Sequence, residues 1–252
     1  LKAALKEHLA ETKQQIGMLD KVFKSIGEKA SGEKCDAIEG LILVDINTLA
    51  DGEFRNNRLT RALTWNPGGV LAGARHVTIG GNVAYVIANA GLVIVDLTDP
   101  LAPKTLATVP LVQGRASALQ FRYLFVTDSD GLKVVDVTQP AQARMVPAAT
   151  LPLASARGVF AARTYIYVAD GARGLAIVDI ERPEQPRLLM HYDAGGAIRD
   201  ARDVVVASTN ASLFAYVADG GGGLKVLQLT APDSQPNFYG FSPEPKPQLI
   251  AR

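Results

Sequence analysis

The sequence predicts a mainly β protein, a β-propeller of four fuller four-stranded blades plus one partial blade, preceded by an N-terminal α-helical segment. Two observations favour this architecture. Charged residues fill 14 of the first 40 positions, and all 14 prolines of the 252-residue chain come later. From residue 40 onward, a Gly-Leu motif recurs at intervals typical of propeller blades. We therefore expect a helical segment over residues 1–40, a propeller over 41–242 and a Pro-rich tail over 243–252.

The helical segment is predicted from an apolar stripe. Its members recur every three or four positions, as on one face of an α-helix, and they are Leu5, Leu9, Thr12, Ile16, Leu19, Phe23 and Ile26. Lys, Glu and Gln, which are good helix formers, fill the other face. Gly27 suits the end of this helix. Ser31 can then begin a second, shorter helix that runs to about Leu41.

The propeller is predicted from a repeat whose core is Gly-Leu-x-x-Val-Asp. Copies begin at Gly40, Gly91, Gly131, Gly174 and, in degenerate form, Gly223. Runs of β-branched and aromatic residues, bounded by Gly, Asp and Pro, divide each fuller unit into four short strands. In the third unit we expect these strands at residues 158–163, 165–169, 175–180 and 187–192. Such a unit cannot bury both of its faces alone, so several units must stack around an axis.

These motifs resemble those of a known family. The Gly-Leu-x-Ile-Val-Asp unit, with the preceding Ala-Tyr-Val strand and Asp-Gly turn, resembles the LVIVD-repeat β-propellers of bacterial and archaeal cell-surface proteins. The resemblance covers about residues 40–242. It implies an extracytoplasmic binding or scaffolding module, in some members attached to larger surface or redox proteins. The family has no shared catalytic site, so the resemblance assigns no catalytic residue.

The first 42 residues resemble a different family. Residues 6–12, Phe23 and residues 34–42 are similar to the middle of the ferritin-like bacterial stress proteins of the YciE/YciF type. That resemblance implies part of a di-metal carboxylate site, with His8 and Glu11 on one helix and Glu39 on the next. Such a site draws ligands from four helices, so a second copy of the chain would have to complete it. The alternative is a polar patch on a packed helix, which we favour.

Blades stacked around an axis enclose a central channel. A second candidate site is an arc of charged side chains around one mouth of that channel. An arginine precedes the first strand of each fuller blade at nearly constant register, at Arg75, Arg115, Arg157 and Arg202. Asn89 and the turn residues Asp128, Asp170 and Asp219 should lie near them. The arc could bind an anion such as a carboxylate or phosphate. Alternatively, each arginine pairs with a turn aspartate or with carbonyl groups of a neighbouring blade and sets the blade spacing, which repetition favours.

Composition narrows the function. With 26 basic and 25 acidic residues, the net charge of +1 argues against a nucleic-acid binder, and no apolar run approaches a membrane span. We expect no cofactor and no enzyme, because three histidines and no nucleophile motif offer little catalytic chemistry. The favoured function is a protein-interaction or scaffolding module of a periplasmic or cell-surface assembly, which could include further chains that complete the propeller. The alternatives are a metal-binding segment completed by self-association, an accessory subunit of a redox complex, or an enzyme with its site in the channel.

Overall fold

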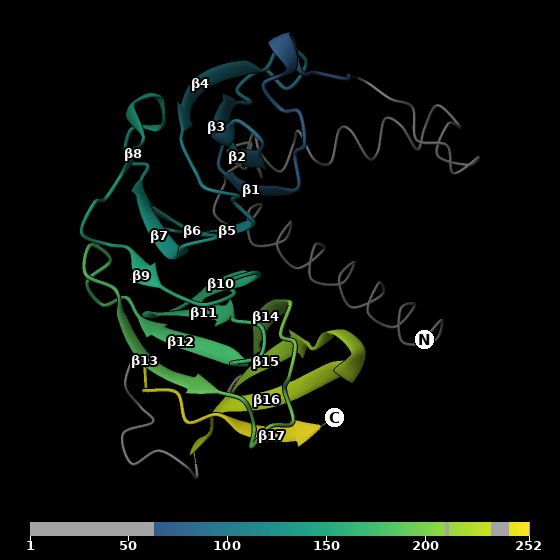
Figure 1. Cartoon of the computed structure of the whole chain (residues 1–252). Helices are drawn as coiled ribbons and strands as arrows, with labels where there is room; N and C mark the ends of the chain where they lie inside the picture. The colour runs from purple at the N-terminus through teal and green to yellow at the C-terminus, as the bar shows by residue number, and fades with distance from the viewer. Residues whose placement is uncertain (1–62, 210–211, 233–241, 252) are drawn as a thin grey trace, which may run out of the picture. The chain divides into compact units, whose positions relative to one another are not determined.

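The computed structural model describes residues 63–209, 212–232 and 242–251 (Figure 1). These residues form four antiparallel sheets, which we call blades 1 to 4 in chain order. The predicted helical segment, the first repeat copy at residues 40–45 and the candidate metal ligands His8, Glu11 and Glu39 lie outside the described residues. Those predictions therefore remain untested by the structure.

Blades 1 and 2 each run from an innermost to an outermost strand in sequence order. Blade 1 consists of β1 (His76–Gly80), β2 (Val83–Ala88), β3 (Gly91–Asp96) and β4 (Lys104–Val109). Blade 2 consists of β5 (Ala116–Gln120), β6 (Tyr123–Asp128), β7 (Gly131–Asp136) and two short strands that pair with β7, β8 (Arg144–Met145) and β9 (Leu151–Pro152). Each sheet is therefore a meander, as the repeat predicts.

Blades 3 and 4 repeat the same order. Blade 3 consists of β10 (Val159–Ala162), β11 (Tyr165–Ala169), β12 (Leu175–Asp179) and β13 (Arg187–Tyr192). Blade 4 consists of β14 (Asp203–Ser208), β15 (Leu213–Ala218), β16 (Leu224–Thr230) and β17 (Gln248–Ala251). The four strands of blade 3 lie where the sequence predicts them, to within one residue at each end. The sequence analysis assigns β17 to a separate tail, whereas in the structure it pairs with β16 and is the outermost strand of blade 4.

The helical turns among the described residues are short 3-10 segments, η2 (Pro67–Gly69), η3 (Pro140–Gln142) and η4 (Gly220–Gly222). None of them is long and apolar enough to cross a membrane.

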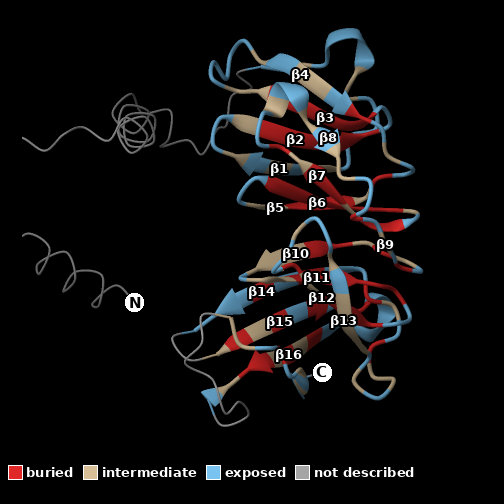
Figure 2. Ribbon diagram, turned by 90° about the vertical axis from the view of Figure 1, so that its left-hand side faces the viewer, coloured by how far each residue is buried: buried red, intermediate tan, exposed pale blue. Residues whose placement is uncertain are grey.

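The blades stack through their innermost strands and through apolar residues between the sheets. β1 lies against β5, β5 against β10, and β10 against β14. Three apolar clusters fill the junctions, one for each pair of successive blades, and Figure 2 shows these buried residues in the interior of the stack. Among the described strands, no contact of this extent joins β14 back to β1. The four blades therefore form an arc with two ends.

The glycine of the repeat motif is required where β3 and β7 begin. Gly91 and Gly131 have φ values of +115° and +134°, which side chains of L-residues rarely adopt. A Cβ atom built on either glycine would overlap the carbonyl oxygen of the neighbouring outer strand, that of Val109 or Leu151. The motif therefore combines a tight hairpin turn with a close approach of the outermost strand.

Candidate functional site

Two of the arginines predicted to line the channel mouth reach from one blade to the next. Arg75 donates from Nη1 to the carbonyl oxygen of Gly114 at 3.5 Å, and Arg115 donates from Nη1 to that of Ala156 at 2.5 Å. Gly114 and Ala156 each lie directly before the arginine of the following blade. The same contact is thus repeated at two successive junctions, and the geometry is that of a spacer between blades.

The arginines of blades 3 and 4 share one carboxylate. Arg157 Nη1 lies 2.8 Å from Asp200 Oδ1, and Arg202 Nε lies 2.8 Å from Asp200 Oδ2. Hydrogen bonds from Arg202 and then Arg157 lower the pKa of the Asp200 carboxyl group below its ordinary value. Arg157 therefore spans the junction between blades 3 and 4, as Arg75 and Arg115 span theirs. Arg202, at the end of the arc, instead contacts a residue of its own blade.

The three turn aspartates are buried and hold backbone groups. Each accepts hydrogen bonds from backbone N–H groups of the loop that leads into the innermost strand of its own blade. The donors are Val112 to Asp128 (3.3 Å), Ser155 to Asp170 (2.6 Å), and Arg199 and Asp200 to Asp219 (2.8 and 2.6 Å). These carboxylates therefore fix the loops that precede the innermost strands, and in the described residues the four arginines of the predicted arc do not pair with them.

A basic side chain accompanies each buried carboxylate. The pairs are Lys133 with Asp128 (2.6 Å), His191 with Asp170 (3.0 Å) and Lys225 with Asp219 (3.9 Å). Blade 1 has the uncharged Ala88 at the aspartate position and Val93 at the lysine position, so both charges are missing together. This pattern is expected because a buried charge without a partner is costly. These buried carboxylates and their basic partners therefore act within each blade.

The pKa of Lys133 reflects this pairing. Burial of the ammonium group acts to lower its pKa, but hydrogen bonds to Asp128 and Asp130 outweigh burial and raise the pKa above the ordinary value. The ammonium group therefore stays charged at every physiological pH.

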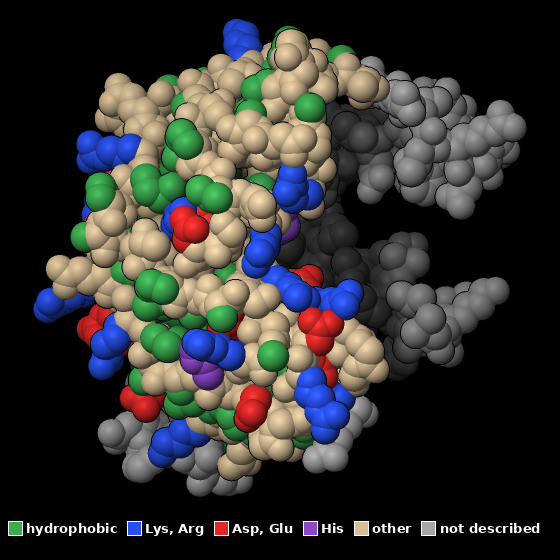
Figure 3. Space-filling view, viewed as in Figure 1, with side chains coloured by type: hydrophobic (Ala, Val, Ile, Leu, Met, Phe, Trp, Pro, Cys, Tyr) green, Lys and Arg blue, Asp and Glu red, His purple; other side chains and the backbone are tan. Residues whose placement is uncertain are grey.

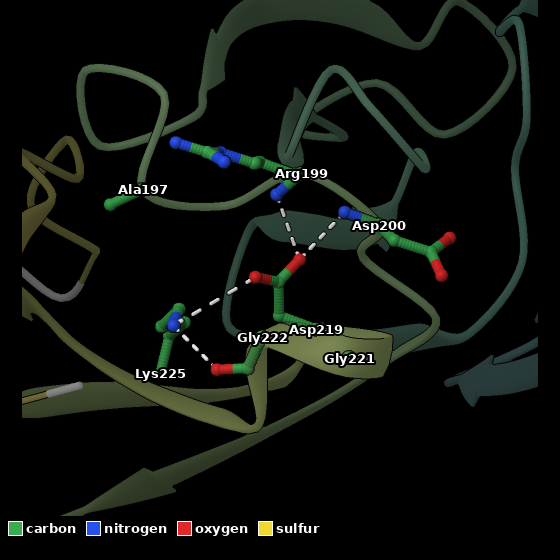
Figure 4. Close-up of a pocket in the computed structure, with 7 residues that line it drawn as sticks. All are labelled: Ala197, Arg199, Asp200, Asp219, Gly221, Gly222 and Lys225. Atoms are coloured by element: carbon green, nitrogen blue, oxygen red, sulfur yellow. Dashed lines mark hydrogen bonds and ion pairs between the residues drawn. The ribbon is translucent and has the colours of Figure 1, made fainter.

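The pocket at the mouth of blade 4 is built around Asp219 (Figure 4). It has a volume of about 500 Å³ and is lined by Ala197, Arg199, Asp200, Asp219, Gly221, Gly222 and Lys225. Lys225 Nζ donates to the carbonyl oxygen of Gly222 at 2.6 Å, and Arg199 Nε donates to that of Gly196 at 2.9 Å. Two cations thus face two carboxylates, and the pocket carries little net charge that could select an anion.

The sequence analysis missed a further surface, which is the face of the blade 4 sheet that points away from blade 3. The aromatic residue at the centre of the second strand is buried in blades 1 to 3 as Tyr85, Phe125 and Tyr167, whereas Tyr216 of blade 4 is 39% exposed. The motif leucine is fully buried as Leu92, Leu132 and Leu175, whereas Leu224 is 55% exposed. Blade 4 therefore has the residues of an internal blade, but none of the other described blades covers them.

These exposed residues form one continuous surface. Tyr216 pairs with Val205 of β14 on one side and with Val226 of β16 on the other, so the three side chains form a row across the sheet. Leu224 lies two residues from Val226 and so faces the same way. Val205 is 51% exposed. We call Val205, Tyr216 and Leu224 the end face of blade 4. The repeat register could have located these positions, but it does not say whether a neighbour covers them.

The described residues hold no group of three or more His, Cys, Asp or Glu side chains that could bind a metal ion. Charges of both signs lie interspersed on the face of the molecule shown in Figure 3, so no broad basic surface is visible there. The apolar end face of blade 4 is therefore a better candidate binding surface than the charged arc.

Comparison with known proteins supports both resemblances. The LVIVD repeat model matches residues 73–109, 118–147, 155–194 and 198–240. The model described as "Domain of unknown function (DUF892)", the ferritin-like YciF family, matches residues 1–63. No curated protein matches the sequence.

Several solved structures are similar in fold. The computationally designed Ika4 protein is 14% identical, with a TM-score of 0.50 over 69% of this chain and 100% of that chain. BamB from Moraxella catarrhalis is 17% identical, with a TM-score of 0.44 over 60% of this chain and 42% of that chain. The WD40 domain of SCAP from fission yeast is 12% identical, with a TM-score of 0.45 over 72% and 42%. Since the four repeat matches cover more than half of its length, the chain belongs to the LVIVD-repeat family.

Proposed function

We propose that the chain is a non-enzymatic protein-interaction or scaffolding module of a cell-surface or periplasmic assembly, and that it docks through the end face of blade 4. The observation that carries this proposal is the exposure of Tyr216, Leu224 and Val205 on one face of a sheet. The counterparts of Tyr216 and Leu224 in blades 1 to 3 are all buried. Aromatic residues such as tyrosine are enriched in the cores of protein interfaces and among the residues that contribute most of the binding energy.

The state of the polar groups supports a binding role over a catalytic one. His76 accepts a hydrogen bond from the backbone N–H of Ser117 at its Nδ1 atom, over 3.2 Å, and burial lowers its pKa. His191 is held by Asp170. These two are the histidines of the described residues, and each serves a contact within the fold. The arginines and aspartates of the predicted arc also make contacts within the fold, so most of their polar groups are already engaged in structural interactions.

The cellular setting of the proposal comes from the family. LVIVD repeats resemble those of bacterial and archaeal surface proteins, and an extracytoplasmic module would meet its partner in the periplasm or at the cell surface. Partner identity then depends on shape and apolar complementarity at the end face, because that surface carries few charges.

The proposal is tested with a photoactivatable amino acid placed at Tyr216 of the full chain in its native host. We expect irradiation to give a protein adduct of defined mass. The matched control places the same group at Leu101, which is 67% exposed in a loop of blade 1, away from the end face. Equal adducts at both positions, or no adduct at Tyr216, would contradict the proposal.

A further inference from the structure

We propose that the partner at the end face of blade 4 is blade 1 of a second copy of this chain, so that two arcs close one ring head to tail. This inference rests on the proposed function and names the partner. It follows from the two ends of the described arc. One end exposes the face that a preceding blade would cover, and the other exposes the face that a following blade would cover.

Among the described residues, no blade precedes blade 1, whereas a blade precedes each of the other three. Val77 and Ile79 on its innermost strand are 56% and 57% exposed. The residues at the position of Val77 in blades 2, 3 and 4 are buried against the preceding blade, and they are Ser117, Val159 and Val204. Blade 4, in turn, has no following blade within the part of the chain that the structure describes. Each end therefore presents the half of a junction that the other end needs.

The arginine spacers lead to the same arrangement. Arg75 and Arg115 each donate to the carbonyl group directly before the next blade's arginine. Arg202 ends the series and lies 62% exposed beside Asp200. In a second copy, the equivalent acceptor is the carbonyl group of Ala74, which directly precedes Arg75. A junction between copies would thus continue an interface that already exists within the chain.

The geometry of blade 1 confines the junction to the innermost strands. Trp65, Val70 and Leu71 pack against the strands β2 and β3 on the free side of blade 1. The exposed part of that side is therefore β1, which would meet β14 of the second copy. This matches the internal junctions, where the innermost strands of successive blades lie against one another.

A second copy of the chain would bury the exposed apolar residues at both ends of the arc. A different partner on blade 4 would leave Val77 and Ile79 of blade 1 exposed, whereas two copies related by a two-fold axis bury both ends in two identical junctions. Closed assemblies of this kind are the usual outcome when the rotation between copies closes. The apolar character of both ends also suits a contact that excludes water.

The first experiment measures the mass of the full chain by sedimentation velocity over a range of concentrations. We expect a dimer that dissociates on dilution. Val205→Asp and Val77→Asp should each weaken dimerisation by at least about tenfold, because each buries a charge in an apolar junction. Leu101→Asp, an equally drastic change on an exposed loop, should leave dimerisation unchanged. Circular dichroism verifies that all three variants remain folded.

Mixing the two variants tests the head-to-tail geometry. In a mixed pair, one junction carries both substitutions while the other joins two intact faces, so mixing should restore dimers that neither variant forms alone. A monomeric wild-type chain would overturn the inference, as would a dimer that Val77→Asp leaves intact or the absence of rescue on mixing.

The outcomes also separate this inference from the proposed function. If Tyr216 is cross-linked to another protein while the purified chain stays monomeric, the self-assembly is refuted and the docking role stands. If Tyr216 gives no adduct at all, both are refuted.

Discussion

Removing the cation from a buried ion pair should strongly destabilise the fold. Asp128 is fully buried, and the Lys133 side chain that pairs with it over 2.6 Å is only 11% exposed. Lys133→Val leaves the carboxylate uncompensated, which costs about 3 kcal/mol for a buried pair. The second contact of Lys133, with Asp130, adds little, since the Asp130 side chain is 53% exposed and exposed pairs contribute less than about 1 kcal/mol.

Blade 1 provides the matched control for this substitution. It carries the uncharged residues Ala88 and Val93 at the two positions, so Asp128→Asn combined with Lys133→Val gives blade 2 an uncharged pair as well. The double variant should recover to within about 1 kcal/mol of the wild type, because asparagine can still accept the hydrogen bond from Val112 and no charge remains buried. Urea denaturation at neutral pH measures all three free energies of unfolding.

Two results would refute this reasoning. The first is a cost of Lys133→Val below about 1 kcal/mol, which would mean that the carboxylate is not a buried, uncompensated charge. The second is a double variant no more stable than the single one. The pH dependence provides an independent test. Because the pKa of Lys133 is raised in the folded state, its stabilising effect is complete below the unfolded pKa of about 10.4 and is lost as pH rises through the folded value. Lys133→Val should lack that part of the alkaline loss.

The remaining predictions concern the hairpin glycine, a histidine and an arginine spacer. Gly131→Ala should destabilise by more than Gly223→Ala in thermal unfolding, because both have positive φ but only Gly131 faces a neighbouring carbonyl group; equal costs would contradict the close approach. Burial lowers the pKa of His76, so its stabilising effect, present above about pH 6.5, should be lost as pH falls through the folded pKa, and acid titration of His76→Gln should show a smaller loss. Arg115→Met should cost about 1 kcal/mol in urea denaturation, and no measurable cost would argue against the spacer role.

The strands could be predicted because turn-forming residues such as glycine and aspartate mark where they begin and end. In blade 3, Gly174 and Asp179 bound the motif strand, and the predicted strands agree with the observed ones. The strand β17 could not be predicted from the Pro-rich tail, because its pairing with β16 is a long-range contact. Local sequence shows that residues 248–251 can extend, but it does not show which strand they join.

The candidate site, too, was predictable from the sequence only in part. The regular spacing of the arginines could be predicted, but their acceptors could not, because the carbonyl groups of Gly114 and Ala156 have no side-chain signature. The end face shows the limit most clearly. Tyr216 and Tyr85 are the same residue at the same register, and only the presence or absence of a following blade distinguishes the exposed one from the buried one.

The most direct test of the account maps what Tyr216 touches. A chain with a photoactivatable residue at position 216 is mixed with an isotopically labelled chain, and mass spectrometry identifies the joined peptides. We predict an adduct between position 216 and the labelled peptide that contains β1, residues 76–80. An adduct confined to one chain, one that maps to a different strand, or no adduct would contradict the account.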